Sequence, residues 1–248
     1  MTPFHEEINE LHSYLETYSL KYGYYSVTSL VIKYNILISI LKMFINLNDE
    51  SDKAALSVQL EKATIILQDH YDKTSRIILV EHNFHIIKEH LKNQKIFLEY
   101  DYNYYIKHYQ PTAQKVQNET YTLKGDYSHS HHIISDNVYI YIVDKYGELI
   151  IYQQPISIID LVFRKEFKSS QGYSLIHPYL VKTKDIIIQG AGEIIFVKNN
   201  SKEIKGCVVN NKSGHFMPPE STLQNVNMAL KDTFKNNITI INIAIKKF

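Results

Sequence analysis

Apolar residues in the first third of the chain recur every three or four positions, which is the spacing of one face of an α-helix. The clearest series is Val27, Leu30, Val31, Tyr34, Leu37, Leu41, Phe44 and Ile45. Later series occupy Leu56, Leu60, Ala63 and Leu67, and then Ile77, Val80, Phe84, Ile87 and Leu91. With one more helix at the N-terminus, residues 4–92 are expected to form four helices, and their short connections predict antiparallel neighbours in a small bundle. The segment 77–80 alone also fits a strand.

From Lys95 onward, β-branched and aromatic residues dominate and turn signals recur, which is typical of strands. The clearest hairpin joins 138–143 to 148–152 through a turn that contains Gly147. Further strands are expected near 95–100, 119–124, 161–167, 185–189, 193–198, 204–210 and 238–245. Proline is tolerated in the first turn of a helix, so Pro218-Pro219 predicts a final helix over about 219–235.

These patterns together predict an α+β fold. An N-terminal helical bundle over residues 1–94 is followed by a largely antiparallel β-sheet domain over residues 95–248, which ends with a late C-terminal helix. The longest apolar run is interrupted by Lys33, Asn35 and Lys42. This pattern predicts a buried helix rather than a membrane span.

The net charge and the N-terminal sequence limit which binding partners and which cellular compartment we expect. The formal net charge of +1 gives no global field that would attract nucleic acid, so nucleic acid is not an expected partner. The N-terminus lacks the basic and apolar regions of a secretory signal. We therefore expect a cytoplasmic protein, or one secreted into a host cell by a signal-peptide-independent system. The single Cys207 lies in a predicted strand and is expected to be a small buried hydrophobe rather than a nucleophile.

A glutamate and a histidine fall at the same end of two predicted neighbouring strands. Glu193 comes directly after Gly190-Ala191-Gly192, and His215 follows Gly214, so little side-chain bulk is expected to cover either residue. In an antiparallel pair, the start of the Glu193 strand lies beside the end of the next strand, at about residues 210–213. A carboxylate and an imidazole side by side are the minimum equipment for general acid–base catalysis. Glu193 and His215 are therefore the predicted catalytic residues.

Nearby polar residues extend this pair to a predicted ligand cleft. The expected ligand-binding residues are His177, Tyr179, Asn211, Ser213 and Gly214. A structural alternative stays open, in which Ser213 and His215 fasten the entry to the last helix and Gly214 supplies an unusual backbone angle. A histidine beside a proline, as at His177, is also commonly structural.

Two groups of histidines have spacings that could hold a metal ion. His129 and His131 would share one face of a strand, whereas His82, His85, Glu89 and His90 would share one face of a helix. The first group has no accompanying carboxylate or cysteine at ligand spacing, and the second equally fits a polar helix face. We interpret them as a solvated loop and a polar helix face, and we predict no metal site.

Four segments of the second half form a distinctive series: 136–149, His177-Pro-Tyr-Leu180, Gly190-Ala-Gly-Glu193 and Ser213-Gly-His-Phe-Met-Pro218. Together they resemble the plant IQ-motif-containing (IQM) family and bacterial proteins that share its C-terminal domain. Their order and spacing agree with the family over about residues 136–235. Pro178-Tyr179 and Phe216 depart from it, because the family has Ser-Ser and tyrosine there. The resemblance implies a domain with partner-binding roles and, in bacteria, an association with toxins and secreted effectors. The chain contains no IQ motif, so calmodulin binding is not expected.

Two functional hypotheses follow, and whether the protein is an enzyme stays open between them. In the first, a bacterial effector- or toxin-like protein binds NAD or a nucleotide at the Glu/His cleft. The Glu193 strand is similar to that of mono-ADP-ribosyltransferase toxins, which implies that Glu193 orients the nicotinamide ribose while His177, Tyr179 or His215 holds the cofactor. A ribonuclease is a further enzymatic option that the near-zero net charge disfavours. In the second hypothesis, the chain is a non-catalytic module that binds a host or cellular protein.

Overall fold

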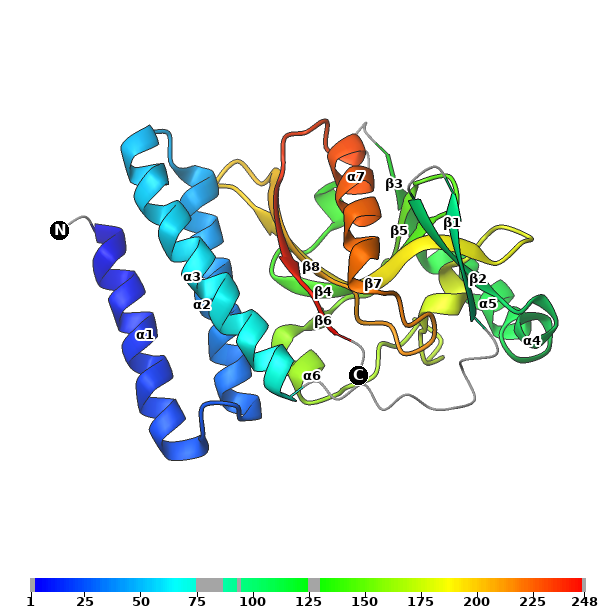
Figure 1. Cartoon of the computed structure of the whole chain (residues 1–248), viewed down its shortest axis with the longest axis horizontal. Helices are drawn as coiled ribbons and strands as arrows, with labels where there is room; N and C mark the ends of the chain where they lie inside the picture. Colours follow the sequence, from blue (N-terminus) through cyan, green and yellow to red (C-terminus); the bar gives the residue numbers. More distant parts are fainter. Residues whose placement is uncertain (1–2, 75–86, 93–94, 125–129, 247–248) are drawn as a thin grey trace.

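The computed structural model describes residues 3–74, 87–92, 95–124 and 130–246. Three long helices come first: α1 (Pro3–Tyr22), α2 (Val27–Asn46) and α3 (Glu50–Thr74). Nine strands then form one sheet (Figure 1). These strands are β1 (Ile87–Lys92), β2 (Lys95–Tyr100), β3 (Thr120–Leu123), β4 (Asn137–Asp144), β5 (Leu149–Tyr152), β6 (Ile156–Ser157), β7 (Ile187–Lys198), β8 (Ile204–Asn210) and β9 (Thr239–Ile243). The predicted α+β class is confirmed.

α2 is the central helix of the N-terminal bundle. Ser26 caps it, because the Ser26 side chain accepts a hydrogen bond from the Ser29 backbone N–H at 3.2 Å. Among the described residues, α2 is the one helix that is long and apolar enough to cross a membrane. In this fold, however, Ile36, Leu37 and Leu41 are buried in the core that the bundle shares with the sheet. The structure thus uses α2 as a core helix, as the interrupted apolar run predicts.

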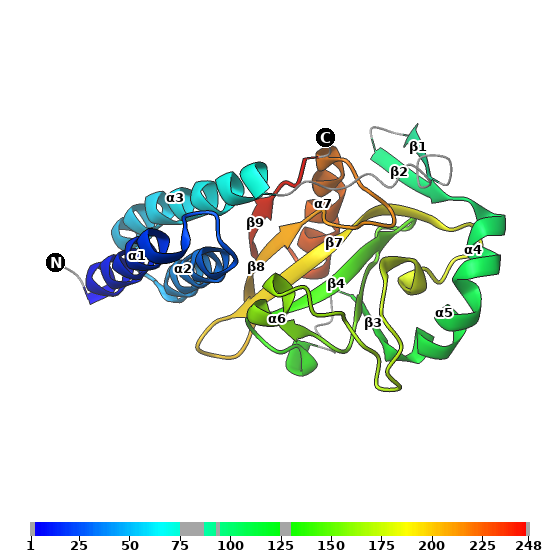
Figure 2. The ribbon, with the colours of Figure 1, turned by 90° about the horizontal axis from the view of Figure 1, so that it is seen from below.

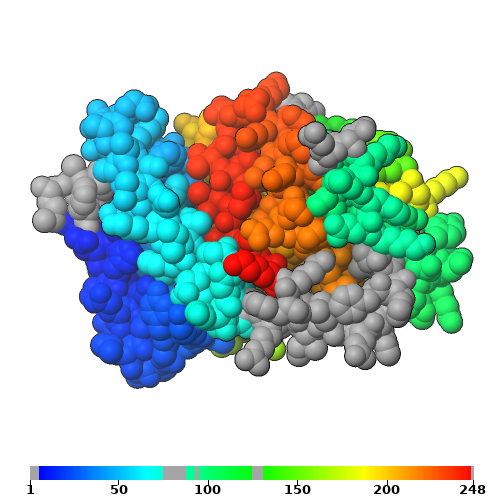
Figure 3. Space-filling model, in the orientation of Figure 1, coloured from blue at the N-terminus to red at the C-terminus, as the bar shows by residue number. Residues whose placement is uncertain are grey.

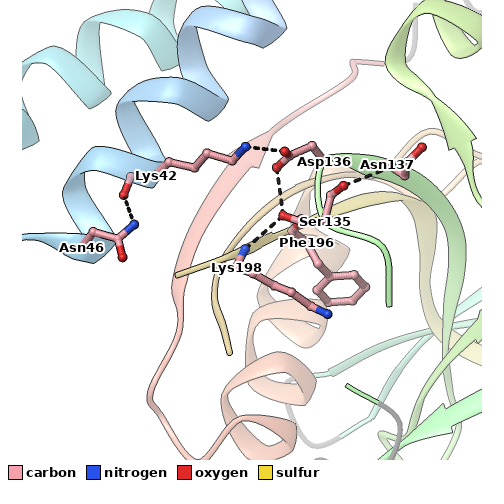
Figure 4. Close-up of polar contacts among 7 residues, drawn as sticks. All are labelled: Lys42, Asn46, Ser135, Asp136, Asn137, Phe196 and Lys198. Carbon is pink, nitrogen blue, oxygen red and sulfur yellow. Dashed lines mark hydrogen bonds and ion pairs between the residues drawn. The ribbon is translucent and has the colours of Figure 1, made fainter. Parts of the chain in front are cut away.

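A polar network ties the last turns of α2 to the sheet (Figure 4). Lys42 donates to the Asp136 carboxylate, and the Asp136 backbone N–H donates to the Phe196 carbonyl at 3.0 Å. The Ser135 hydroxyl donates to Asp136 and accepts from the Lys198 backbone N–H at 3.1 Å. The network therefore joins the bundle to the segment before β4 and to the end of β7.

β7 is the longest strand and organises the sheet. One edge of β7 pairs with β4 from Ile188 to Ile195. The other edge pairs first with β2, at Ile187 and Ile188, and then with β8, from Ile194 onward. Side chains cover the interval between these two partners: the Asn225 amide donates to the Gln189 carbonyl at 3.1 Å, and the Asn210 amide oxygen accepts from the Glu193 N–H at 3.0 Å. The pairs are antiparallel except β8–β9, which is parallel.

The two faces of the sheet are covered by different helices (Figures 1 and 2). The bundle lies at the β8–β9 end, where α2 contacts β7 and β8 and α3 contacts β9. On the same face, at the far end, lie α4 (Tyr102–His108), α5 (Gln110–Val116) and the short turn η4 (His177–Leu180). The opposite face is covered by α7 (Leu223–Thr233), which follows the turn η5 (Glu220–Thr222) and confirms the predicted final helix.

The side chain of Gln68 on α3 completes the outer edge of the sheet just beyond β9. Its amide nitrogen donates to the Ala244 carbonyl at 2.6 Å, and its amide oxygen accepts from the Ala244 N–H at 2.8 Å. This two-bond pairing copies the way one strand residue pairs with another. In the space-filling view, the α3 segment lies directly against the C-terminal strand (Figure 3).

Three predicted elements differ from the structure. The predicted fourth helix is wrong over Ile87–Lys92, which form β1 and pair with β2; its earlier part, residues 75–86, lies outside the described residues. The predicted strand near 161–167 is wrong because Ser157 caps a short helix, α6 (Ile158–Val162), whose apolar residues enter the core. The strands expected at 185–189 and 193–198 are one strand, β7, which runs straight through its glycines.

Those glycines are required by close packing rather than by a turn. A Cβ atom on Gly192 would lie 1.9 Å from the Asn210 carbonyl oxygen, and one on Gly190 would lie 2.6 Å from Val226 Cγ2 on α7. The sequence suggests that these glycines leave Glu193 uncovered, and the structure shows that they do not. The domain boundary expected at residue 94 stays a prediction; the hairpin β1–β2 spans it.

Candidate functional site

Glu193 lies in the middle of β7, on the face of the sheet toward the bundle. Because Ile194 pairs with Val209, Glu193 lies opposite Asn210 at the point where β8 ends. The Asn210 side chain holds Glu193 twice: its nitrogen donates to Oε2 at 3.0 Å, and its oxygen accepts from the Glu193 backbone N–H at 3.0 Å. This reciprocal contact fixes the glutamate side chain in one orientation.

Lys212 supplies the counter-charge for Glu193. Lys212 Nζ donates to Glu193 Oε1 at 3.0 Å, and the Lys212 backbone N–H donates to the Asn210 side-chain oxygen at 2.9 Å. The Glu193 side chain is 8% exposed and the Lys212 side chain 44%. Each carboxylate oxygen thus has a donor, and the pair runs from the interior outward.

Two tyrosines from the bundle lie above this pair. The hydroxyls of Tyr34 on α2 and Tyr71 on α3 are 2.6 Å apart, and both side chains are buried. Burial raises the pKa of Tyr71 well above its usual value, and electrostatic interactions with Tyr34 and Glu193 add to this shift. The pKa of Tyr34 is raised for the same first reason, with Glu193 again contributing. Both phenols therefore remain neutral and act as hydrogen-bonding groups next to the glutamate.

His177 lies at the start of η4 and is buried beside the same stretch of β7. Its Nε2–H donates to the Gly192 carbonyl at 3.0 Å. Burial lowers the pKa of His177 to about 3; the hydrogen bond to Gly192 opposes this shift, and the charges of His215 and Lys212 add to it. His177 is therefore a neutral structural donor at physiological pH, in agreement with the structural interpretation of a histidine beside proline.

His215 does not pair with Glu193. No hydrogen bond joins the two in the part of the chain that the structure describes; the His215 ring instead packs edge-on against Tyr109 on the α4–α5 segment, with 5.8 Å between ring centroids. Burial lowers the pKa of His215. The structure thus gives the two predicted catalytic residues separate contacts. Their catalytic role stays a prediction.

The other predicted binding residues have structural contacts. Asn211 donates to the Pro218 and Ile245 carbonyls, at 2.9 and 3.1 Å, and accepts from the Ile245 N–H at 2.7 Å. Ser213 Oγ accepts from the Phe216 N–H at 3.3 Å, which fastens the segment before α7 as the structural alternative expects. The unusual backbone angle expected at Gly214 occurs instead at Met217, whose φ is +43°.

A cavity of about 510 Å³ opens beside Lys212. We call it the Lys212 cavity. Its lining includes Lys212, Ser213 and Gly214 from the loop after β8, His70 and Tyr71 from α3, and Arg164 just after α6. Small-molecule sites in proteins commonly have 300–1,000 Å³. The cavity thus has room for a small ligand between the bundle and the sheet. Tyr179, which the sequence assigns to the same site, lines a different cavity of about 590 Å³ beside α5.

Two cationic side chains, Arg164 and Lys212, line the Lys212 cavity, and Lys212 is also paired with Glu193. Among the described residues, no aspartate or glutamate belongs to the lining itself. Behind it, Lys33 Nζ lies 3.3 Å from His70 Nδ1. Burial lowers the pKa of His70 to about 4, with the nearby Lys33 charge as the second cause, and burial lowers the pKa of Lys33 to about 8. The arrangement suits a ligand that carries negative charge and accepts hydrogen bonds.

The histidine clusters do not assemble a metal site in the described residues, where no group of three His, Cys, Asp or Glu side chains has suitable geometry. His82, His85 and His129 lie outside the described residues. His90 lies on β1, where Nε2 contacts Glu99 at 2.6 Å. Cys207 is fully buried and burial raises the pKa of its thiol, so it is a core residue as predicted.

Sequence reasoning missed four residues that define the site: Asn210, Lys212, Tyr34 and Tyr71. Asn210 and Lys212 had a signal, because the antiparallel pairing already placed their segment beside Glu193. The tyrosines had none, since only the packing of the bundle on the sheet brings them there. No family model, curated protein or solved structure matches this chain, so the IQM resemblance stays a prediction.

Proposed function

We propose that this protein binds a small anionic ligand, such as a nucleotide or NAD, in the Lys212 cavity. The observation that carries the proposal is that two cationic side chains, Arg164 and the Lys212 that Glu193 holds in place, line a cavity of about 510 Å³. Phosphate and carboxylate groups are the usual partners of such cations. An effector- or toxin-like role belongs to the proposal through the sequence resemblance alone.

In this proposal Glu193 is a positioning residue. Both of its carboxylate oxygens are already engaged, by Asn210 and by Lys212, and its side chain is 8% exposed. A glutamate that orients the ribose of NAD has to reach the ligand, so the geometry favours ligand binding over ADP-ribosyl transfer. Glu193 instead holds the Lys212 ammonium at the cavity wall, where it meets the ligand.

The test is a thermal-shift and calorimetric titration of the full chain with NAD, ADP-ribose, ATP, nucleoside monophosphates and pyrophosphate. A ligand that binds only the folded state raises Tm by mass action. We expect at least one of these anions to raise Tm. Arg164→Gln should weaken its binding by about 10- to 100-fold, because it removes a charge-assisted hydrogen bond.

Arg164 is an exposed residue outside the core, so the substitution should leave the fold intact. The matched control is Lys165→Gln, an exposed neighbour whose Nζ pairs with Asp160 at 3.3 Å rather than lining the cavity. Absence of any shift across the panel, or equal loss of affinity in both variants, would refute an anion site in this cavity.

A protein-interaction role is the second candidate function, and one observation favours it. Of the 16 large apolar or aromatic side chains that are exposed in the described residues, seven fall between Tyr14 and Val27. Such concentrations of exposed apolar and aromatic residues mark interaction sites in monomeric proteins.

A further inference from the structure

One exposed row of side chains runs along the outer face of α1. The row consists of Glu6, Glu10, Tyr14, Tyr18 and Tyr22, which are spaced four residues apart and are all exposed. We call it the Glu–Tyr ridge. Rows at this spacing are the ridges that pack into the grooves of a neighbouring helix. Ile8 and Leu15 of α1 are buried in the core shared with α2, whereas every residue of the ridge is exposed.

The tyrosine rings of the Glu–Tyr ridge are accessible to a partner protein. Tyr18 and Tyr22 are stacked, with 5.7 Å between centroids, and Tyr14 is 51% exposed. Tyrosine offers a large, fairly rigid surface at low entropic cost, which makes it frequent at interfaces. In Figure 1, α1 is the outermost helix of the bundle, and its outer side is free of other elements.

The charge around the ridge specifies the chemistry of a partner. α1 carries Glu6, Glu7, Glu10 and Glu16 against the single Lys21. Tyrosine rings in this region already receive cations within the molecule. Lys33 Nζ lies 3.4 Å from the Tyr24 ring centroid and 5.0 Å from that of Tyr25, and Lys21 Nζ lies 5.0 Å from that of Tyr22. Carboxylates and tyrosine rings together favour an approaching cation.

We propose that the Glu–Tyr ridge is a docking surface for a basic, arginine-bearing helix of a partner protein. The inference rests on the protein-interaction role and adds the partner's charge and shape to it; the Lys212 cavity is not required for it. A second copy of the chain is a poorer occupant, because two acidic α1 helices would repel each other.

The experiment measures fluorescence anisotropy of a labelled, designed amphipathic helix with arginines along one face, titrated with the full chain. Matched peptides carry glutamine or glutamate in place of arginine. We expect the arginine peptide to bind, more weakly as salt rises, and the two matched peptides to show at least about 10-fold lower affinity. Simultaneous Tyr14→Ala, Tyr18→Ala and Tyr22→Ala should weaken binding by about 10- to 100-fold, since each exposed cation–π contact contributes modestly.

Matched variants separate the rings from other effects. Tyr→Phe at the same three positions should keep affinity within about two-fold, because the ring face remains. Tyr146→Ala, which removes a 73% exposed tyrosine elsewhere on the surface, should leave binding unchanged. Thermal melts of each variant verify that it is folded.

Three outcomes would overturn the inference. Equal binding of the arginine and glutamine peptides through the ridge would keep an interaction role but remove its basic partner. Equal binding of the arginine peptide to wild type and to the alanine variant would place the contact elsewhere. Dimerisation of the chain that the alanine substitutions abolish, seen by light scattering, would make a second copy the occupant. The nucleotide titrations report on the Lys212 cavity independently of all three.

Discussion

The two faces of β7 are both buried, yet they contain different kinds of side chain. Toward α7, Ile194 and Phe196 pack in an apolar cluster and the glycines leave room for the helix and for the Asn210 backbone. Toward the bundle, Glu193 lies among Asn210, Lys212 and two tyrosines. The α7 face is limited by volume, whereas the bundle face adds a charged and hydrogen-bonded group at Glu193 to its apolar residues, such as Ala191 and Ile195. Only the second kind of surface offers groups that a ligand can use.

The largest expected effect tests the volume limit of the α7 face. Gly192→Ala should lower the free energy of unfolding by at least about 3 kcal/mol, since the new Cβ would lie 1.9 Å from a backbone carbonyl that cannot move alone. Urea unfolding measures it. Gly214→Ala is the control, because its Cβ would meet no atom within 4 Å. Similar small losses in both would show that the Asn210 backbone can shift to accept a side chain at position 192.

The next largest effect is the pH dependence of stability that His177 causes on the bundle face. The pKa of His177 is about 3 in the folded state, below its unfolded value, so the unfolded state binds more protons as the pH falls. The contribution of neutral His177 to the free energy of unfolding is fully present above about pH 6.5 and is lost as the pH falls toward 3. Between pH 7 and pH 5 we expect a loss of about 2 kcal/mol.

Urea unfolding at several pH values should therefore show a steeper acid loss in wild type than in His177→Gln. His90→Gln, at an exposed position on the β1–β2 hairpin, is the matched histidine substitution away from β7. Parallel slopes for wild type and His177→Gln would mean that His177 takes up its proton without unfolding.

A smaller effect tests the ion pair itself. Lys212→Met leaves the buried Glu193 carboxylate without its charged donor and should cost about 1.5 kcal/mol, at the low end for a charge-assisted bond because Lys212 is half exposed. The double variant with Glu193→Gln should recover most of this loss, since the buried charge is gone. Additive losses in a double-mutant cycle would contradict a coupled pair.

The smallest effect returns to the α7 face. Gly190→Ala should cost about 1 kcal/mol, because its Cβ meets the end of the Val226 side chain, which can shift, rather than backbone. Comparison of its unfolding midpoint with that of Gly192→Ala tests whether side chain or backbone limits the space beside β7. A loss as large as that of Gly192→Ala would show that α7 cannot adjust.

Local pattern was sufficient for the elements whose periodicity and caps agree with their packing. α2, the hairpin of β4 and β5, and α7 were all predictable in this way. The segment 87–92 was not, because its apolar spacing also fits a helix and only pairing with β2 decides for a strand. Ser157 is an N-cap residue that signals the start of α6. The β-branched residues around it favour a strand, so the sequence pattern did not reveal the helix.

The site was predictable only in part. Antiparallel pairing located Glu193 beside the segment after β8, but glycine was taken as a sign of exposure when it reflects close backbone approach. The contacts that Glu193 and His215 make, with Asn210 and Lys212 in one case and with Tyr109 in the other, depend on packing between distant segments, which the sequence pattern does not specify. Tyr71 lies more than 100 positions from Glu193 in the sequence, and no local pattern links them.

The amide of Gln68 has a consequence for the behaviour of the protein in concentrated solution. An unpaired sheet edge invites strands of other molecules and so promotes aggregation. By occupying both backbone groups of Ala244, Gln68 blocks that growth at the end of β9 with a side chain from another part of the chain. Detachment of α3 would therefore expose the backbone groups of Ala244 to strands of other molecules. In this way the bundle protects the protein against self-association.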